Sequence, residues 1–434
     1  MSKRFSILVL IPFTLVCSTA SAQTHVFKVG GTGGLTSIQA AVDAAGDGDL
    51  ILIRPGSYAA FSASGKSVSI LPTPSFSVSI SGECHVEALP TGRTMLVGGF
   101  SCTTASGSTS ALVVRYNDGA IVLREAQFLG PAGDYAPPAV RLLDNDIVVA
   151  NGCSFTGLSS GSYFGRGGTG MIARRSNFAS YGSSFTGGNG GGVINCNSFY
   201  WGYDGADGGD GFQSPEGFLF AASSTFRGGN GGAGGPDDYD PFTGIYTPAG
   251  TDGDGGNGVF LGSLPPTVLD PHIERQQSSF TGGLDGGYMG SCGYAGSPGQ
   301  GIKVSNGSVG TVTAGVRTIS LQSLAYESSV IQLTASGASG ERVYLMFSQF
   351  PDFQYDASLA GCRLLRQPML ASNLSIGTIP PSGTLQTPIL LRRLPPSDET
   401  GTFMVQAAFV APNGAVQLSN GTAIALVDIG VSLN

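Results

Sequence analysis

Three aspartates spaced three residues apart, Asp204, Asp207 and Asp210, lie in a glycine-rich part of the chain. Carboxylates spread through such a segment could collect Ca²⁺, a hard cation that takes six to eight oxygen ligands. Aromatic residues accompany them, and a ring beside polar groups suits the face of a sugar. The candidates for sugar contact are Trp201, Tyr203, Tyr239 and Tyr246. The plainer interpretation, which the sequence favours, is that acidic loops keep the protein soluble and tolerate insertion.

Arginines beside repeated phenylalanines form a second candidate site. Arg174 and Arg175 precede Phe178, and Arg227 follows Phe226. If these segments stack on one another, the three guanidinium groups would line one face and attract the carboxylates of acidic sugars. Polar residues alternate on any exposed strand, which explains the same arginines without a ligand.

The three histidines, His25, His85 and His272, lie far apart in the chain and share no motif. The sequence around them has neither a metal-ligand spacing nor a nucleophile–base–acid set. We identify no catalytic residue here and treat each histidine as an ordinary strand or surface residue.

Composition indicates a folded, strand-rich protein. The 434 residues are 41% hydrophobic and 12% charged, which excludes a disordered chain. The 69 glycines suit many short strands joined by turns, and the length suits one large domain and one small one.

Residues 1–22 have the pattern of a secretory signal peptide. Lys3 and Arg4 form the basic start, residues 7–16 the apolar stretch, and Ala20-Ser21-Ala22 the cleavage site. No segment reaches the roughly 20 apolar residues that a membrane span requires. Removing the signal leaves 19 basic and 29 acidic side chains, a formal charge of −10, which argues against nucleic acid as a partner. We expect a monomer that is secreted or held at the cell surface.

An internal repeat ends on phenylalanine and predicts a solenoid. "IVLREAQF" ends at Phe128, "LFAASSTF" at Phe226 and "IERQQSSF" at Phe280, each with an apolar residue seven positions earlier. Such short units cannot bury a core alone and stack into a rod with a shared interior. The residues predicted to stack inside it are Phe128, Phe155, Phe178, Phe199, Phe226 and Phe280.

The glycine-rich stretch between Phe226 and Val259 interrupts this repeat with hardly an aliphatic side chain. We expect a long loop pushed out between two strands of the rod, or a degenerate coil plus a loop. Glycine would give that loop conformational freedom without adding apolar surface.

Six cysteines remain after the signal, an even number that permits disulfides in an exported chain. Cys84 and Cys102 are 18 residues apart, about one coil, so we predict that they stack and form a disulfide. Cys153 and Cys196 lie two repeats apart, beyond the roughly 7 Å between Cα atoms that a bridge allows, so we predict no bond there.

The N-terminal segment predicts a helix followed by a buried strand, since Ile38, Ala41 and Val42 share one helical face and residues 50–53 are apolar throughout. The stretch "LTSIQAAVDAAGDGDLILIRPGSY" resembles the opening of pectin methylesterases and other right-handed parallel β-helix proteins of the pectate-lyase-like superfamily. The resemblance implies three strands per coil, a helical N-terminal cap and ligands bound in a groove on the outside. It covers residues 26–311, of which only the first thirty match closely.

The catalytic motifs of the enzymes in this superfamily are missing. The Gly-x-Tyr-x-Glu segment of pectin methylesterases is broken, because Gly56-Ser57-Tyr58 is followed by Ala59 and Ala60. The segments that supply paired aspartates and an arginine are absent, as are the signatures of polygalacturonases and pectate lyases. These absences argue against the three activities.

Residues 313–434 have a different texture, with alternating strands such as "RVYLMFSQ" and hairpin turns such as Pro412-Asn413-Gly414. They predict a small β-sandwich. The segment "FMVQAAFVAPNGAVQLSNGTAIAL" is similar to C-terminal modules of exported bacterial proteins, which implies display or attachment.

We therefore expect an all-β protein: a signal peptide over 1–22, a right-handed parallel β-helix with a short N-terminal capping helix over 23–312, and a β-sandwich over 313–434. The favoured function is a non-catalytic exported protein that binds polysaccharide through acidic, aromatic, glycine-rich loops. Two alternatives stay open: a lyase or hydrolase of a divergent β-helix family, and a structural spacer. Calcium is the only cofactor for which the sequence offers candidate ligands.

Overall fold

The computed structural model describes residues 23–74, 77–104, 109–131, 137–160, 162, 165–192, 203–240, 243, 245–262, 270–289, 294–366, 371–391 and 393–431. The predicted signal peptide, Trp201, Phe199 and Cys196 lie outside these residues. The regular secondary structure of the described part is almost entirely strand, with one α-helix, α1 (Ile38–Ala44), and 3₁₀ turns at Gly286–Met289 and Ala357–Leu359. No helix in it is long and apolar enough to cross a bilayer.

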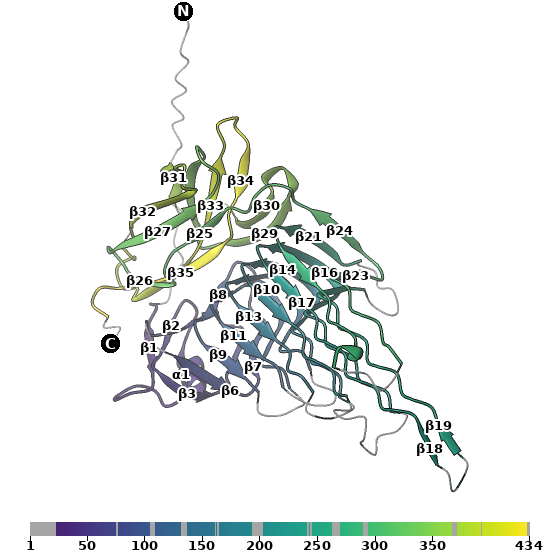
Figure 1. Ribbon diagram of the computed structural model, residues 1–434. Helices are drawn as coiled ribbons and strands as arrows, with labels where there is room; N and C mark the ends of the chain where they lie inside the picture. Colours follow the sequence, from purple (N-terminus) through teal and green to yellow (C-terminus); the bar gives the residue numbers. More distant parts are fainter. Residues whose placement is uncertain are drawn as a thin grey trace, which may run out of the picture.

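Two stacks of parallel strands form the body of the protein, which confirms the predicted solenoid-like arrangement (Figure 1). The larger sheet contains β1 (Val26–Val29), β2 (Leu50–Ile53), β4 (Ser62–Ser64), β5 (Ser69–Pro72), β7 (Cys84–Glu87), β8 (Thr94–Gly98), β10 (Leu112–Arg124), β12 (Val140–Asn151), β14 (Met171–Tyr181), β16 (Phe212–Ala222), β20 (Val259–Leu261), β21 (His272–Gln276), β23 (Ile302–Val304) and β24 (Ser308–Thr311). The smaller sheet contains β3 (Gly56–Ala59), β6 (Val78–Ser81), β9 (Ser101–Thr103), β11 (Gln127–Leu129), β13 (Ser154–Thr156), β15 (Ser184–Thr186), β17 (Thr225–Arg227) and β22 (Ser279–Thr281).

The long strands of the larger sheet bend, so each coil has three straight sides. In β10, β12 and β14 the bend lies at Tyr116, Asp144 and Arg175, whose backbones are left-handed with φ of 58°, 54° and 45°. We call the strand segments before the bends, together with β4, β7, β20 and β23, face 1. The segments after the bends, together with β1, β2, β5, β8, β21 and β24, are face 2, and the smaller sheet is face 3.

A column of phenylalanine rings fills the interior behind face 3. Phe128, Phe155, Phe185, Phe226 and Phe280 lie in register on successive strands, with neighbouring ring centroids 4.5 to 5.6 Å apart. Their planes lie within 19° of parallel. Stacked rings of this kind bury large apolar area and fix the coil spacing.

The predicted column was wrong at Phe178. This residue lies on β14 in face 2 and meets the ring of Phe185 edge-on, with centroids 5.9 Å apart. Apolar side chains from all three faces fill the same interior. The sequence therefore does not show to which face a buried phenylalanine belongs. Phe199 lies outside the described residues.

Helix α1 packs its apolar side against the first coils. Its N-cap is Ser37, whose hydroxyl accepts a hydrogen bond from the amide of Ala40 at 3.1 Å. Ile38 and Val42 are buried in the same hydrophobic cluster as Ile51 of β2.

The C-terminal region has two sheets on either side of a hydrophobic cluster of its own. The first contains β25 (Thr318–Ser320), β27 (Val330–Ser336) and β32 (Thr384–Leu390). The second contains β26 (Leu324–Tyr326), β28 (Arg342–Ser348), β31 (Ala371–Thr378), β33 (Thr400–Val410), β34 (Val416–Leu418) and β35 (Thr422–Val427). A hairpin of β29 (Pro351–Asp356) and β30 (Gly361–Leu365) completes the region.

The C-terminal region covers the outer side of face 2. Leu96 and Val122 of face 2 share a hydrophobic cluster with Leu364 of β30. Polar contacts join the same surfaces, since the buried side chain of Asn151 donates to the carbonyl oxygen of Gly421 at 2.7 Å. The C-terminal region therefore buries much of the outer side of face 2. A pocket of about 200 Å³ remains where Asn151 and Tyr181 meet Thr318 and Asn420.

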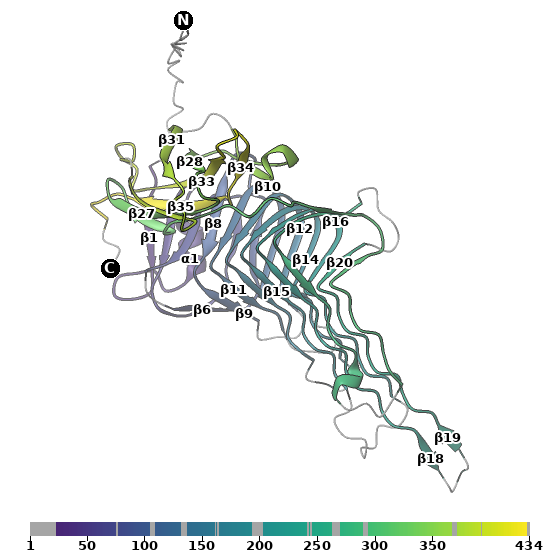
Figure 2. The ribbon, with the colours of Figure 1, turned by 45° about the horizontal axis from the view of Figure 1, so that its top comes forward.

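The glycine-rich segments form a second ordered structure, which we call the glycine bundle. It comprises residues 157–160, 165–170, 187–192, 203–211, 228–237, 248–258, 282–289 and 294–301. Figure 2 shows these segments side by side, running from the β-helix toward the hairpin of β18 (Asp238–Asp240) and β19 (Ile245–Thr247).

Backbone hydrogen bonds between segments hold the glycine bundle together, which corrects the expectation of a loose loop. The amides of Gly188, Gly209 and Gly229 each donate to a carbonyl oxygen of a neighbouring segment at 2.8 Å. A Cβ on Gly209 would lie 2.1 Å from the oxygen of Gly168, so only glycine permits this approach. Glycine here allows close packing of extended backbones.

Candidate functional site

A three-residue period orders the glycine bundle. Gly205, Gly208 and Gly211 each donate a backbone hydrogen bond to the next segment. This period and the dependence on glycine are those of packed polyproline II helices, which have three residues per turn. Every third side chain therefore points to the same side. The three aspartates, which are spaced three residues apart, therefore lie on the same side of their segment.

The three aspartates form the first of three rows on one face of the bundle. The second row is Thr251, Asp254 and Asn257, and the third is Tyr294, Ser297 and Gln300. We call these nine residues the polar rows.

Side chains of one row hydrogen-bond to backbone amides of the next, which sets their register. Asp204 Oδ1 accepts from the amide and the hydroxyl of Thr251, each at 2.8 Å. Asp207 Oδ1 accepts from the amide of Asp254 at 3.0 Å, and Asp254 Oδ1 accepts from the amide of Ser297 at 2.7 Å. Each of these carboxylates thus satisfies a backbone donor, as does Asp210, which is buried and accepts from the amide of Asn257.

Six residues of the polar rows line a groove of about 390 Å³: Asp207, Asp210, Asp254, Asn257, Ser297 and Gln300. The first residue of each row, Asp204, Thr251 and Tyr294, lies outside its lining. Cationic side chains stand at its border: Arg166 pairs with Asp207, and Lys303 follows the third row. Amide side chains lie between them, and Gln213 donates to Asp210 Oδ2 at 2.6 Å. The groove therefore offers carboxylate acceptors, amide donors and acceptors, and cations within a rigid backbone frame.

Hydrogen bonds hold Asp204, the first residue of the first row, in its ionised form. The amide and hydroxyl of Thr251 lower the pKa of Asp204 below its ordinary value, because both hydrogen bonds favour the charged form. The second carboxylate oxygen of Asp254 has no protein hydrogen bond among the described residues, and the side chain of Gln300 has none either. These atoms are free to meet a ligand.

The structure does not bring the predicted calcium ligands together. Three residues of a polyproline II helix rise about 9 Å, so Asp204 and Asp207 are too far apart to share one cation with ligand distances near 2.4 Å. Across the described residues, no group of three or more His, Cys, Asp or Glu side chains is arranged to hold a metal ion.

Of the aromatic residues predicted to contact a sugar, those that the structure describes lie at the end of the glycine bundle far from the β-helix. Tyr203 and Tyr246 are exposed, and the hydroxyl of Tyr246 donates to Asp237 at 3.0 Å, a contact that raises the pKa of Tyr246. The backbone of Tyr239 lies opposite that of Tyr246 in the β18–β19 hairpin. The sequence reasoning missed Tyr294, which is 60% exposed and begins the third polar row; its place in the three-residue period was the available signal.

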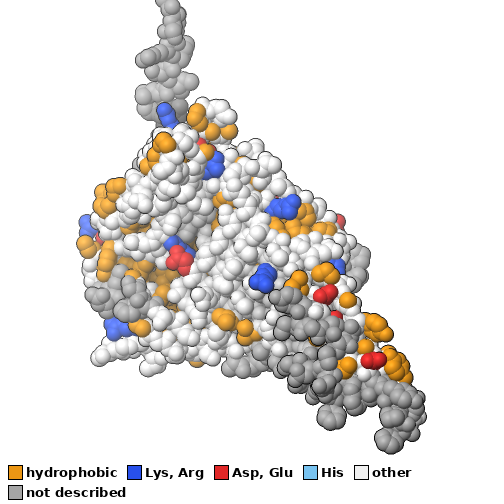
Figure 3. Space-filling view, in the orientation of Figure 1, with side chains coloured by type: hydrophobic (Ala, Val, Ile, Leu, Met, Phe, Trp, Pro, Cys, Tyr) orange, Lys and Arg blue, Asp and Glu red, His pale blue; other side chains and the backbone are white. Residues whose placement is uncertain are grey.

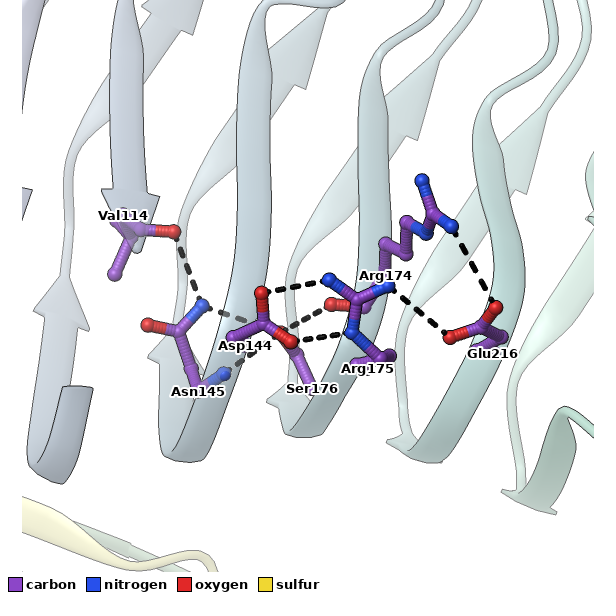
Figure 4. Close-up of polar contacts among 7 residues, drawn as sticks. All are labelled: Val114, Asp144, Asn145, Arg174, Arg175, Ser176 and Glu216. Carbon is purple, nitrogen blue, oxygen red and sulfur yellow. Dashed lines mark hydrogen bonds and ion pairs between the residues drawn. The ribbon is translucent and has the colours of Figure 1, made fainter. Parts of the chain in front are cut away.

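The predicted arginines do not share one face. Arg174 and Arg175 lie at the bend of β14, whereas Arg227 lies on β17 of face 3. Figure 4 shows Arg175 aimed at Asp144 of the preceding coil, with Nη2 2.8 Å from Oδ2. Glu216 of the following coil is buried, 3.8 Å from Arg174 Nη2 and 3.6 Å from Arg175 Nη1.

The charged side chains of this cluster contact one another, which indicates a structural role. Hydrogen bonding from Arg175 lowers the pKa of Asp144, so the pair is held ionised. Beneath it, Asn145 Nδ2 donates to Val114 oxygen at 3.0 Å and to Ser176 Oγ at 3.1 Å, which ties three successive coils together. The guanidinium groups are thus balanced by carboxylates of the chain itself, and a uronate would have to displace them.

Cys84 and Cys102 lie side by side, with their sulfurs 3.6 Å apart as free thiols. A bond requires about 2.05 Å, so the predicted disulfide is not formed in this structure and stays a prediction for the exported chain. Cys153 is also a free thiol, and burial raises its pKa to about 12. Cys196, for which we predict no bond to Cys153, lies outside the described residues.

Comparison with known proteins assigns no family. No protein-family model and no curated protein matches the chain. Among solved structures, full-length tailspike protein 2 from Escherichia coli O157:H7 bacteriophage CAB120 aligns at 8% identity with a TM-score of 0.20, over 95% of this chain and 69% of that chain. A likeness this weak assigns neither fold nor activity, and the fold rests on the strand register. The right-handed turn of the coils and the relation to pectate-lyase-like proteins stay predictions.

Proposed function

We propose that the protein is exported and binds polysaccharide, without cleaving it, in the groove over the polar rows. The observation that carries this proposal is the order of the glycine bundle. Backbone hydrogen bonds hold Asp207, Asp254 and Gln300 in a fixed array, so a ligand does not have to order a loop before binding.

The groove suits a neutral or amino sugar better than an acidic one. Asp207, Asp210 and Asp254 line it, while its two cations include Arg166, which is already paired with Asp207. Sugar hydroxyls can both donate to carboxylates and accept from amide side chains, whereas a uronate would meet repulsion from the aspartates. The exposed ring of Tyr294 begins the third row, about 9 Å along the bundle from the groove residue Ser297, where a longer sugar chain would reach it.

The groove carboxylates are engaged by the chain itself, which favours binding over catalysis. Asp207 pairs with Arg166 and accepts from the amide of Asp254, and Asp210 accepts from the side chains of Gln213 and Asn257. The alternatives, a divergent polysaccharide-cleaving enzyme and a structural spacer, are therefore outcomes that the test has to separate.

A glycan array with the full mature chain, followed by titration of the best ligand, tests the proposal. Gln300→Ala removes a groove side chain that makes no hydrogen bond among the described residues, and we expect about tenfold weaker binding. Asp254→Asn keeps the oxygen that accepts from Ser297 and removes the charge, so it should weaken an amino sugar more than a neutral one.

Arg141→Ala on face 1 is the matched control, since Arg141 is exposed and lies outside the groove. It should bind like the unaltered chain. No binding to any glycan would leave the spacer alternative, and release of shortened sugars during incubation would favour the enzyme.

A further inference from the structure

The outward side chains of face 3 form a two-dimensional lattice of hydroxyl groups. Strand register aligns them in two columns across the coils. The first column is Ser57, Ser79, Ser101, Gln127, Ser154, Ser184, Thr225 and Ser279. The second is Ala59, Ser81, Thr103, Leu129, Thr156, Thr186, Arg227 and Thr281. We call these sixteen positions the hydroxyl face; none of them is buried.

The hydroxyl groups of this face are not used by the protein. The one hydrogen bond that their side chains make among the described residues joins Ser279 to Thr225 at 3.3 Å. Serines that point inward beside the same strands behave differently. Ser183 and Ser224 donate to the carbonyl oxygens of Tyr181 and Ala222 at 3.2 and 3.1 Å. The outward hydroxyl groups are therefore free for an external partner.

The spacing of the hydroxyl face follows from β geometry. Neighbouring strands lie about 4.8 Å apart, and alternate residues on one strand lie about 6.7 Å apart. The stacked rings behind the sheet fix this repeat. On the strands β13, β15, β17 and β22, every position of the two columns carries a hydroxyl group except Arg227.

Faces 1 and 2 do not present such an array of free hydroxyl groups. Face 2 is covered by the C-terminal region, and face 1 carries ion pairs such as Arg115 with Glu87. Figure 3 shows a broad surface with few charged side chains over β6, β9, β11 and β13, the strands that Figure 1 places on that side. The aromatic rings of these strands point inward, so the surface offers no platform for a single sugar ring.

We propose that the hydroxyl face binds the surface of ice. A rigid array loses little entropy on binding, and each hydroxyl can exchange a solvent contact for one with an ordered water. Each contact is weak, so high affinity requires many contacts at once. A partner whose surface groups repeat in two dimensions can provide them. Ice has such a repeat, and the threonine methyl groups add apolar contact between the hydroxyls. This activity is separate from the proposed polysaccharide groove.

Thermal hysteresis, the gap between the melting and growth temperatures of an ice crystal, tests the proposal on the full mature chain. We expect a measurable gap and faceted crystals for the unaltered protein. Thr186→Tyr places a ring at the centre of the lattice and should reduce the gap at least twofold. Thr384→Tyr, at an exposed strand position of the C-terminal region, is the matched control and should leave it unchanged.

A gain-of-function variant guards against misfolding as the cause of a loss. Arg227→Thr completes the second column from β13 to β22 and should enlarge the gap, because its side chain makes no described hydrogen bond. Absence of hysteresis and of ice shaping in the unaltered chain would overturn the proposal. Equal hysteresis in Thr186→Tyr and Thr384→Tyr would overturn it as well. Retention of the chain on crystalline cellulose, lost in Thr186→Tyr and without any ice activity, would assign the face to a polysaccharide crystal instead.

Discussion

The β-helix and the glycine bundle are continuations of the same coils, yet opposite interactions hold them together. In the β-helix, Phe155, Phe185 and Phe226 stack inside the coil and side chains set the spacing. In the glycine bundle, a Cβ on Gly229 would lie 1.9 Å from the oxygen of Gly188, so side chains are excluded and backbones set the spacing. One coil register can therefore support two kinds of interior, one apolar and one made of peptide groups.

The largest expected effect is on the apolar interior. Phe185→Ala removes a fully buried ring between neighbours at 4.8 and 4.5 Å and should lower the free energy of unfolding by about 3–5 kcal/mol. Urea denaturation followed by fluorescence measures it, with Phe185→Leu as the milder control. A loss below about 1 kcal/mol would mean that the ring column does not carry the stability of the coil.

A smaller and more local effect is expected in the glycine bundle. Gly229→Ala forces neighbouring backbones apart and breaks the bond from its amide to Gly209, which should cost about 1–3 kcal/mol near that segment. Limited proteolysis between residues 203 and 258 should speed up. Gly46→Ala is the control, since the nearest atom to its Cβ would be 3.7 Å away. Equal proteolysis of the two variants would contradict the close-packed bundle.

The same contrast explains what the sequence could predict. Phe128, Phe226 and Phe280 were identified correctly because a buried ring at a regular interval leaves a clear pattern. Phe178 was misplaced because an interior residue looks alike on every face. The glycine bundle has no apolar pattern, and a run of glycines predicts conformational freedom. Its order lies in the three-residue period of Gly205 and Gly208, which places each amide against the next segment.

Contacts between distant parts of the chain were beyond reach from the sequence. The packing of the C-terminal region on face 2 joins Asn151 to Gly421, and no local pattern announces such a pair. The polar groove is similar, because Asp254 and Gln300 come together only after the segments align in register. Spacing identified the three aspartates, but only the backbone geometry shows that Asp207 and Asp210 line a groove and that the three do not surround a cation.

Acid should weaken the glycine bundle before it weakens the ring column. Hydrogen bonds from Thr251 lower the pKa of Asp204, so this carboxylate contributes stability above its ordinary pKa of about 3.9 and loses it as pH falls through the lower folded value. Amide exchange at Thr251 should accelerate over that range. Asp204→Asn should flatten the pH dependence, and an unchanged profile in that variant would remove Asp204 as the cause.

The smallest expected effect belongs to the charge cluster at the bend. Asp144→Asn weakens a partly exposed pair with Arg175 and should cost about 0.2–1 kcal/mol at low salt. Urea denaturation at two salt concentrations checks this, and the difference should shrink at high salt. A loss of several kcal/mol would show that the cluster holds the coil together as strongly as the rings do.

Site-resolved amide hydrogen exchange tests the central claim, that the glycine-rich segments are ordered by their own backbones. The decisive amides are those of Gly209, Gly256 and Gly283, each bonded to a neighbouring segment at 2.8 Å. We predict that they exchange much more slowly than an unfolded chain, with protection approaching that of the strands on face 3. Exchange at unfolded-chain rates, while the amides of β13 and β15 stay protected, would contradict the account.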